Sequence, residues 1–224
     1  MERVKPEIDD ICHIYNRGTD KRIIFDDEED RFRFIHYLYA CNDTRPLEKI
    51  REPIKDAPAH DAKREPLVDL LALALMPNHI HLAVHQKVEN GISKYVQKTS
   101  VAYTMYYNEK NKRSGALFQG KYKYKFVEDE RYLAMLIWYI HMNPLELFQH
   151  DWKEKGLHNK KAAREFLRSY RWSSFFDYEG IKNFPSLLDL STLGHFTDKE
   201  DVFKDFMSGF TEENLESINH LMLD

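Results

Sequence analysis

The sequence predicts a single unit of alternating strands and helices packed in layers. With 224 residues, the chain is long enough to enclose one sizeable hydrophobic core. Hydrophobic residues make up 42% of it, a content that excludes a disordered chain. Short runs with period-two alternation are interspersed with longer runs of helical spacing. This succession predicts a two-layer sandwich, and leaves open whether the sheet is parallel and whether helices cover one face or both.

The first elements can be assigned from residue pattern. Residues 10–17 alternate as in a strand and end at a Gly-Thr turn signal. Acidic residues at 26–28 then begin an amphipathic helix, because negative side chains stabilise a helix N-terminus. Residues 43–66 contain four prolines and mixed charges, which predicts a polar insertion. Residues 67–85 form one buried strand or two, with a break at Met76-Pro77-Asn78.

The later elements follow the same logic. Helical periodicity over residues 90–111 predicts a second helix, and a glycine-flanked turn leads to a strand over 122–127. Residues 129–142 form an apolar helix that ends at Asn143-Pro144. We therefore expect a first domain over residues 1–150. The aromatic and more acidic residues 151–224 are predicted to be a helical extension packed on it.

Composition excludes some function classes. The longest uninterrupted apolar run, Leu70 to Met76, is far shorter than the roughly 20 residues that a membrane-spanning helix needs. The first ten residues are charged and lack the apolar segment of a signal peptide. Two cysteines, Cys12 and Cys41, are too few for a disulfide framework. We expect a cytoplasmic protein with no membrane partner.

Charge is distributed unevenly along the chain. The formal net charge is −4, but the segment from Lys94 to Lys125 carries +7 between flanks of −4 and −7. Aromatic residues interleave with its cations, as in Lys121-Tyr122-Lys123-Tyr124-Lys125. This composition suits a track for single-stranded nucleic acid, where bases stack on rings. The alternative is a solvated amphipathic helix followed by an edge strand that lysines protect from aggregation.

A pair of histidines is the first candidate for chemistry. His79 and His81 lie in a strand-like apolar run, so period-two geometry places both imidazoles on one face. Two such imidazoles can share a divalent metal, with a third ligand from elsewhere. The alternative is two unrelated histidines on a half-exposed face. His13, on the first strand, either flanks this site or is a hydrogen-bonded sheet histidine.

A tyrosine and an asparagine form the second candidate. Tyr139 and Asn143 are four residues apart on a helix and therefore share a face. A phenol and an amide oxygen aimed at one site can serve as nucleophile and metal ligand. The alternative is a core aromatic followed by a helix-terminal residue, because the chain has 13 tyrosines. His141 is expected to point away from Tyr139.

The order of four motifs resembles a known family. Asn16-Arg17-Gly18 is followed by M-P-N-H-I-H-L, then R-S-G-A-L-F-Q-G-K-Y-K, then Y-I-H-M-N-P. This order is similar to that of the HUH single-tyrosine transposases, including the insertion-sequence and REP-associated tyrosine transposases. The similarity covers roughly residues 8–150, and Arg171 to Phe175 resembles the C-terminal segment of that group.

The resemblance implies a fold and a set of roles. It implies an α+β, ferredoxin-like two-layer sandwich with an antiparallel central sheet. His79, His81 and Asn143 become ligands of Mg²⁺ or Mn²⁺, and Tyr139 becomes the nucleophile. Many relatives have glutamine at the position of Asn143, and either amide offers a carbonyl oxygen. Tyrosines 103, 106 and 107 compete as nucleophiles but lack a following amide and proline in a matching context.

The implied activity is cleavage and rejoining of single-stranded, hairpin-containing DNA through a 5′-phosphotyrosine. The chain is expected to act as a monomer or a homodimer. The expected DNA-binding residues are the basic side chains of the +7 segment together with one from the first strand: Arg17, Lys94, Lys98, Lys112, Arg113, Lys121, Lys123 and Lys125.

Two other functions remain open. One is a metal-dependent phosphoesterase or nuclease, for which histidine-triad hydrolases are the nearest comparison, but Ala83 stands where their third histidine would fall. The other is a hairpin-binding module that has lost cleavage. A covalent protein–DNA product separates the transposase from both.

Overall fold

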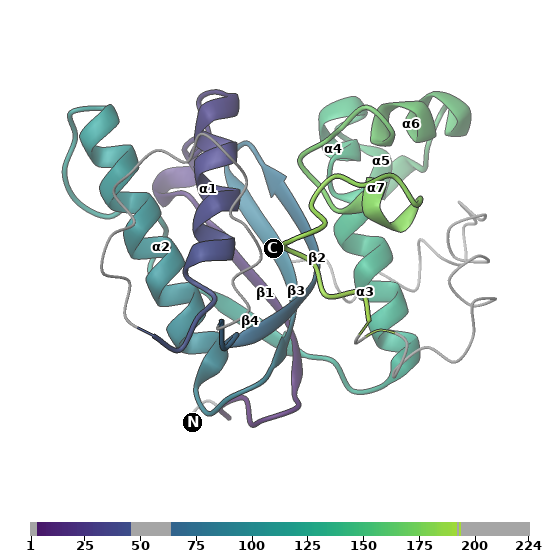
Figure 1. Ribbon diagram of the computed structural model, residues 1–224. Helices are drawn as coiled ribbons and strands as arrows, with labels where there is room; N and C mark the ends of the chain where they lie inside the picture. Colours follow the sequence, from purple (N-terminus) through teal and green to yellow (C-terminus); the bar gives the residue numbers. More distant parts are fainter. Residues whose placement is uncertain (1–3, 46–63, 192, 194–224) are drawn as a thin grey trace.

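A four-stranded antiparallel sheet lies at the centre of the computed structural model, which describes residues 4–45, 64–191 and 193 (Figure 1). Its strands and the helices between them are β1 (Ile11–Arg17), the 3-10 turn η1 (Thr19–Lys21), α1 (Glu28–Ala40), β2 (Val68–Met76), β3 (His79–Gln86), α2 (Gly91–Lys110) and β4 (Lys123–Phe126). The strand order in space is β2-β3-β1-β4, and every neighbouring pair is antiparallel. This is the ferredoxin-like arrangement, so the predicted fold class is confirmed.

The run over residues 67–85 forms two strands. Met76 pairs directly with His79 across a tight turn, so β2 and β3 make a hairpin. All nine residues of β2 are buried. The predicted break at Met76-Pro77-Asn78 is where the hairpin turns. A strand covered on both faces needs no alternation of apolar and polar residues, which explains why the sequence left open whether this run is one strand or two.

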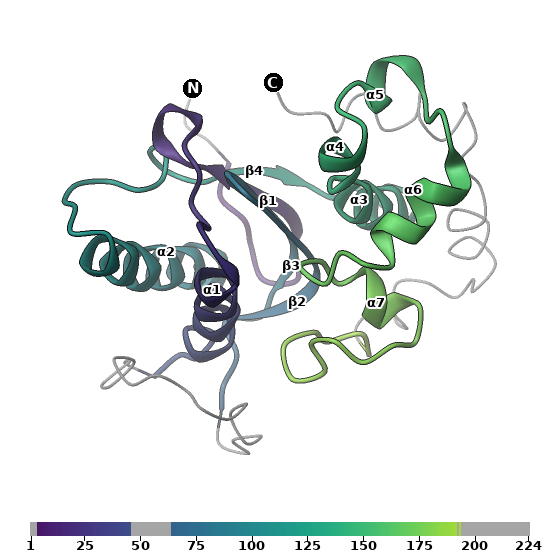
Figure 2. The ribbon, with the colours of Figure 1, turned by 90° about the horizontal axis from the view of Figure 1, so that it is seen from above.

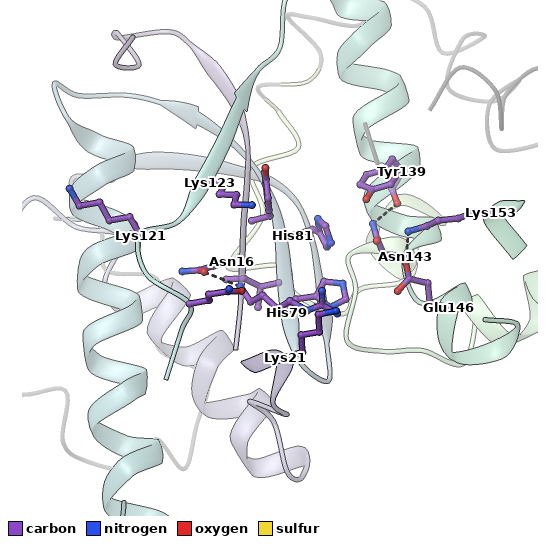
Figure 3. Close-up of a pocket in the computed structure, with 14 residues that line it drawn as sticks. Asn16, Lys21, His79, His81, Lys121, Lys123, Tyr139, Asn143, Glu146 and Lys153 are labelled. Atoms are coloured by element: carbon purple, nitrogen blue, oxygen red, sulfur yellow. Dashed lines mark hydrogen bonds and ion pairs between the residues drawn. The ribbon is translucent and has the colours of Figure 1, made fainter. Parts of the chain in front are cut away.

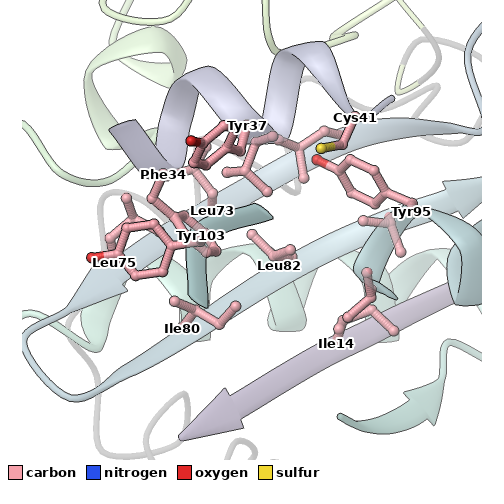
Figure 4. Packing of buried hydrophobic residues seen from close by; sticks show 14 of the residues in the cluster. Ile14, Phe34, Tyr37, Cys41, Leu73, Leu75, Ile80, Leu82, Tyr95 and Tyr103 are labelled. Carbon is pink, nitrogen blue, oxygen red and sulfur yellow. The ribbon is translucent and has the colours of Figure 1, made fainter. Parts of the chain in front are cut away.

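Each face of the sheet packs against a different set of helices. On one face, Ile14 and Leu82 contact the layer formed by α1 and α2, where Phe34 and Tyr103 are fully buried (Figure 4). The opposite face presents Ala74 and Ala83. Small side chains there allow a helix to approach the sheet closely.

Five further helices lie on that second face. Figure 2 shows them across the sheet from α1 and α2. They are α3 (Glu130–Met142), α4 (Leu145–Phe148), α5 (Trp152–Lys155), α6 (Lys160–Leu167) and α7 (Phe175–Tyr178). The Asp129 side chain caps α3 by accepting the Tyr132 N–H at 2.7 Å, and every residue of α3 from Leu133 onward is buried. Helices therefore cover both faces, which the alternation of elements had left open.

A segment of the predicted extension borders the free edge of β2. The Leu75 N–H donates to the Trp172 carbonyl at 2.9 Å, and the Ser174 N–H donates to the Leu73 carbonyl at 3.0 Å. The Ser174 hydroxyl accepts the Leu73 N–H at 3.0 Å. These bonds satisfy backbone groups that an edge strand would otherwise expose.

Two predicted segments lie partly outside the described residues. Most of the insertion expected at 43–66 falls there, as do residues 194–224 of the extension. Within the part of the chain that is described, no helix has the length and apolarity needed to cross a bilayer.

Candidate active site

A pocket of about 520 Å³ lies between the sheet and the C-terminal end of α3 (Figure 3). Its lining includes His79 and His81 of β3, and Tyr139 and Asn143 at the end of α3. The structure thus brings together the two pairs that the sequence singled out, although about 60 residues separate them.

The two histidines stand side by side on one face of β3. Their ring centroids are 5.0 Å apart, with the planes nearly perpendicular at 85°. The Nδ1 atom of His79 lies 2.6 Å from the Asn78 amide oxygen, which can only accept. His79 therefore carries its proton on Nδ1, and its Nε2 atom keeps a lone pair. Burial lowers the pKa of His79 to about 4 and that of His81 well below its usual value, so both rings are neutral at pH 7.

His13 supports His81 from the neighbouring strand. Its Nε2 atom lies 2.9 Å from Nδ1 of His81, and the two rings stack with centroids 5.2 Å apart. His13 is fully buried, and burial, with a smaller effect of Lys125, lowers its pKa to about 3. When His81 donates from Nδ1, its Nε2 atom is left with a lone pair. Both roles weighed for His13 therefore apply: it is a hydrogen-bonded sheet histidine, and its partner is His81 of the site.

Tyr139 and Asn143 approach from the helix side. Tyr139 is 2% exposed, and its ring lies edge-on to His81 with centroids 5.6 Å apart. Burial raises the pKa of the Tyr139 phenol, and the charge of Glu146 adds to this effect. The Asn143 amide nitrogen donates to the Tyr139 carbonyl at 2.8 Å. The buried Asn143 Oδ1 atom has no hydrogen-bond partner among the described residues.

The unpartnered Oδ1 atom of Asn143 is a candidate third ligand for the metal that the resemblance implies. No group of three histidine, cysteine, aspartate or glutamate side chains that could hold a metal occurs in the described ranges. A site here therefore needs an amide as third ligand. Leaving a buried carbonyl oxygen unsatisfied is costly, and cation binding would relieve that cost. Together with the neutral imidazoles of His79 and His81, Asn143 fits a divalent cation.

Among the pocket residues that the sequence analysis missed are two that form an ion pair. Glu146 of α4 and Lys153 of α5 form an ion pair in the pocket, and the Lys153 Nζ atom lies 5.5 Å from the centroid of the Tyr139 ring. Pro144 interrupts the helix before Glu146, so helical spacing from Tyr139 could not be extended to it. Lys153 lies beyond residue 150, where the first domain was expected to end.

The predicted DNA-binding residues separate into two groups. Arg17, Lys121 and Lys123 line the pocket wall opposite Tyr139, as Figure 3 shows for the two lysines. The cations of α2 bond to nearby chain instead: Lys94 donates to the Glu89 carbonyl at 3.1 Å, and Lys98 to the Asp43 carbonyl at 2.6 Å. Arg113 donates to the Asn108 side chain at 2.6 Å, and Lys112 is exposed beyond the end of α2.

The aromatic residues of the +7 segment also divide. Tyr95 and Tyr103 are fully buried, and Tyr107 is 6% exposed, so the tyrosines of α2 that the base-stacking interpretation used are largely core residues. Tyr122 and Tyr124 alternate with the pocket lysines but pack against the core on the α1–α2 side of the sheet, where the Tyr122 hydroxyl lies 2.9 Å from the Ser93 hydroxyl. The amphipathic-helix alternative is therefore the better description of α2, and within residues 121–125 only Lys121 and Lys123 line the pocket. Tyr103 does not line the pocket: it packs in the α1–α2 layer, where its hydroxyl donates to the Ile24 carbonyl.

Comparison with known proteins agrees with this geometry. The family model described as "Transposase IS200 like" matches residues 35–143, from α1 to Asn143. A solved structure described as a REP-associated tyrosine transposase bound to a REP hairpin superimposes with a TM-score of 0.51. That match has 9% sequence identity and covers 85% of this chain and 93% of the other, which shows a shared fold. No curated protein matches the sequence. Over residues 35–143 the chain is thus similar to the IS200-like transposases, and it shares its fold with a REP-associated tyrosine transposase.

Proposed function

We propose that this protein cleaves and rejoins single-stranded DNA through a covalent bond between Tyr139 and a 5′-phosphate. One observation carries the proposal: a buried tyrosine lies edge-on to His81, one helical turn from an amide oxygen that has no hydrogen-bond partner in the described part of the chain. A tyrosine in the hydrophobic core would have no need of two imidazoles and an unsatisfied amide around it.

His79, His81 and Asn143 would hold Mg²⁺ or Mn²⁺. When bound, the cation offsets negative charge on the oxygens of the scissile phosphate. The chain prepares for it by keeping both imidazoles neutral through burial and by fixing the proton of His79 on Nδ1. His13 can fix the proton of His81 on Nδ1 in the same way, by accepting a hydrogen bond from that N–H group.

In the first step, the Tyr139 oxygen attacks phosphorus and the bond to the 3′-oxygen breaks. The products are a 5′-phosphotyrosine and a free 3′-hydroxyl, and the phenolic proton leaves Tyr139. Because burial raises the pKa of this phenol, its deprotonation must be coupled to the attack. In the second step, another 3′-hydroxyl attacks the phosphotyrosine. Each step exchanges one phosphoester for another, so rejoining needs no ATP.

Hairpin-containing single-stranded DNA is the proposed substrate. Its support is the pocket wall of Arg17, Lys121 and Lys123, and the REP hairpin bound to the similar solved structure. Lys125 follows on β4, and the cations of α2 would act only as an outer contact with the backbone. Tyr139 and both histidines come from one chain, which supports a complete site in a monomer.

A gel assay tests this function. The protein is incubated with labelled single-stranded hairpin DNA and Mn²⁺, and the products are separated under denaturing conditions. We expect a covalent protein–DNA band that Tyr139→Phe abolishes and Tyr132→Phe, a control on the same helix, retains. Cleavage without an adduct would indicate a phosphoesterase instead, and binding with neither product would indicate a hairpin-binding module.

A further inference from the structure

The ion pair between Glu146 and Lys153 lies in the pocket but takes no part in the two proposed steps. Both side chains line the pocket, on the wall that carries Tyr139 (Figure 3). Lys153 is 19% exposed and Glu146 is 29% exposed, so both remain open to a ligand in the pocket. A partly exposed ion pair such as this one contributes little to stability, so fold stability alone is a weak reason for the pairing.

The position of Lys153 is well defined by its neighbours. It follows Trp152, which is fully buried and anchors α5 against the second face of the sheet. Its Nζ atom lies 5.5 Å from the Tyr139 ring centroid. The backbone of its partner is held next to the site, because the Glu146 backbone N–H donates to the Asn143 carbonyl at 3.1 Å. The pair thus holds an ammonium group beside the nucleophile.

The cations around the pocket are distributed asymmetrically. Arg17, Lys21, Lys121 and Lys123 come, in that order, from β1, η1, the loop before β4, and β4. Of the described lining residues on the helix side, Lys153 alone is basic. A phosphate attacked by Tyr139 must come within about 3–3.5 Å of the phenolic oxygen. That phosphate then lies between the strand-side cations and Lys153, within reach of a flexible four-carbon side chain.

We propose that Lys153 binds the scissile phosphate from the tyrosine side, and that Glu146 holds its ammonium group until the phosphate takes the place of the carboxylate. This inference rests on the proposed function, because it assumes that DNA enters the pocket. It makes the segment after residue 150 a contributor to the active site. The exchange replaces one anionic partner of the ammonium by another and breaks no covalent bond.

Binding measurements at several salt concentrations test the inference without requiring cleavage. Neutralising one phosphate of a single strand contributes about 0.7 to the slope of log affinity against log salt concentration. We expect Lys153→Met to reduce the slope for single-stranded hairpin DNA by about this amount, and Lys153→Arg to retain it. The matched control is Lys155→Met, because Lys155 lies on the same helix, is 65% exposed and pairs with Asp151 outside the pocket. That variant should keep the wild-type slope.

Adduct formation gives the second readout. Loss of a charged contact to the reacting group costs roughly 100-fold in rate. We expect Lys153→Met to lose about that factor in the rate of adduct formation at saturating DNA, and Lys153→Arg to recover most of it. Glu146→Gln should tighten DNA binding, because the phosphate no longer competes with a carboxylate. Weaker DNA binding by Glu146→Gln would overturn the holding role of Glu146.

The outcomes separate this inference from the proposed function. If the wild type forms no adduct, the proposed function fails, and the salt slope still tests whether Lys153 contacts a phosphate. If the wild type forms the adduct and Lys153→Met equals Lys155→Met in slope and rate, the inference is wrong. Lys153→Arg keeps the positive charge and so distinguishes loss of charge from misfolding. If the salt slope falls equally in the arginine and methionine variants, Lys153 makes no charge contact with a phosphate.

Discussion

The lone oxygen of Asn143 is the residue-scale feature on which the site depends. Its amide nitrogen is bonded to the Tyr139 carbonyl, which fixes the side chain and leaves Oδ1 buried without a partner in the described structure. The sequence placed this residue four positions after Tyr139, but spacing alone could not distinguish a ligand from a helix-terminal asparagine. The unsatisfied oxygen is what separates the two interpretations.

Substitution of Asn143 should affect metal dependence more than folding. We expect Asn143→Ala to lose adduct formation at Mn²⁺ concentrations that saturate the wild type, and Asn143→Gln, which keeps an amide oxygen, to retain it. The measurement is the adduct rate against Mn²⁺ concentration. Asn111→Ala is the control, because the Asn111 amide nitrogen makes the same bond to a carbonyl four residues earlier, that of Tyr107 on α2. Equal Mn²⁺ dependence in both alanine variants would contradict a ligand role for Asn143.

His36, on α1 and away from the pocket, gives a pH prediction. Burial, with nearby Arg33, lowers its pKa to about 4, below the value of about 6.5 in an unfolded chain. Between these values only the unfolded state binds the proton, so stability falls as pH decreases from about 6.5 to about 4. We expect His36→Gln to reduce the slope of the unfolding free energy with pH by up to about 1.4 kcal/mol per pH unit in that window. Denaturant titrations at pH 6 and pH 4.5 measure it, and an unchanged slope would contradict the assignment.

At the scale of elements, the strands and long helices were predictable, and the contacts between distant segments were not. Period-two alternation identified β1, and helical periodicity identified α2 and α3. The histidine pair was predictable as sharing one face for the same reason. The pairing of residues 172–174 with β2 was not predictable. A strand-like stretch of three residues is too short to show a period, and about 100 residues separate it from β2.

That edge contact yields a stability prediction. The Ser174 hydroxyl accepts the Leu73 N–H and lies 2.8 Å from Nε2 of buried His141. Ser174→Ala leaves two buried polar groups without partners, and we expect it to lower the free energy of unfolding by about 2 kcal/mol. Ser169→Ala, at an exposed hydroxyl, is the control and should change it by less than about 0.5 kcal/mol. Urea denaturation measures both, and equal effects would contradict a structural role for the edge contact.

At the scale of the whole molecule, some lysines of the +7 segment stabilise the fold and others line the pocket. The +7 segment predicted one continuous track, but part of its charge stabilises the contact between α1 and α2. Lys110 pairs with Asp27 and with fully buried Asp30. Lys121 and Lys123 line the pocket instead. The sequence could not show which lysines pair with α1 and which line the pocket, because this depends on the face of the fold on which each side chain lies.

The two groups of lysines should differ in DNA binding. We expect the pair Lys121→Ala and Lys123→Ala to reduce the salt dependence of binding to single-stranded DNA by about two phosphate contacts, a slope change of about 1.4. The pair Lys94→Ala and Lys98→Ala, whose ammonium groups bond to carbonyls of the chain, should change it less. Fluorescence anisotropy across a salt series measures both. A larger effect of the α2 pair would place the DNA along α2 instead.

The most direct test of the central claim is to identify the amino acid that carries the DNA. The covalent adduct formed with hairpin DNA and Mn²⁺ is digested with nuclease and protease, and the nucleotide-bearing peptide is sequenced by mass spectrometry. The account predicts a phosphodiester on Tyr139 and none on Tyr132 in the same peptide. A nucleotide on Tyr106, Tyr107 or any residue other than Tyr139 would contradict it.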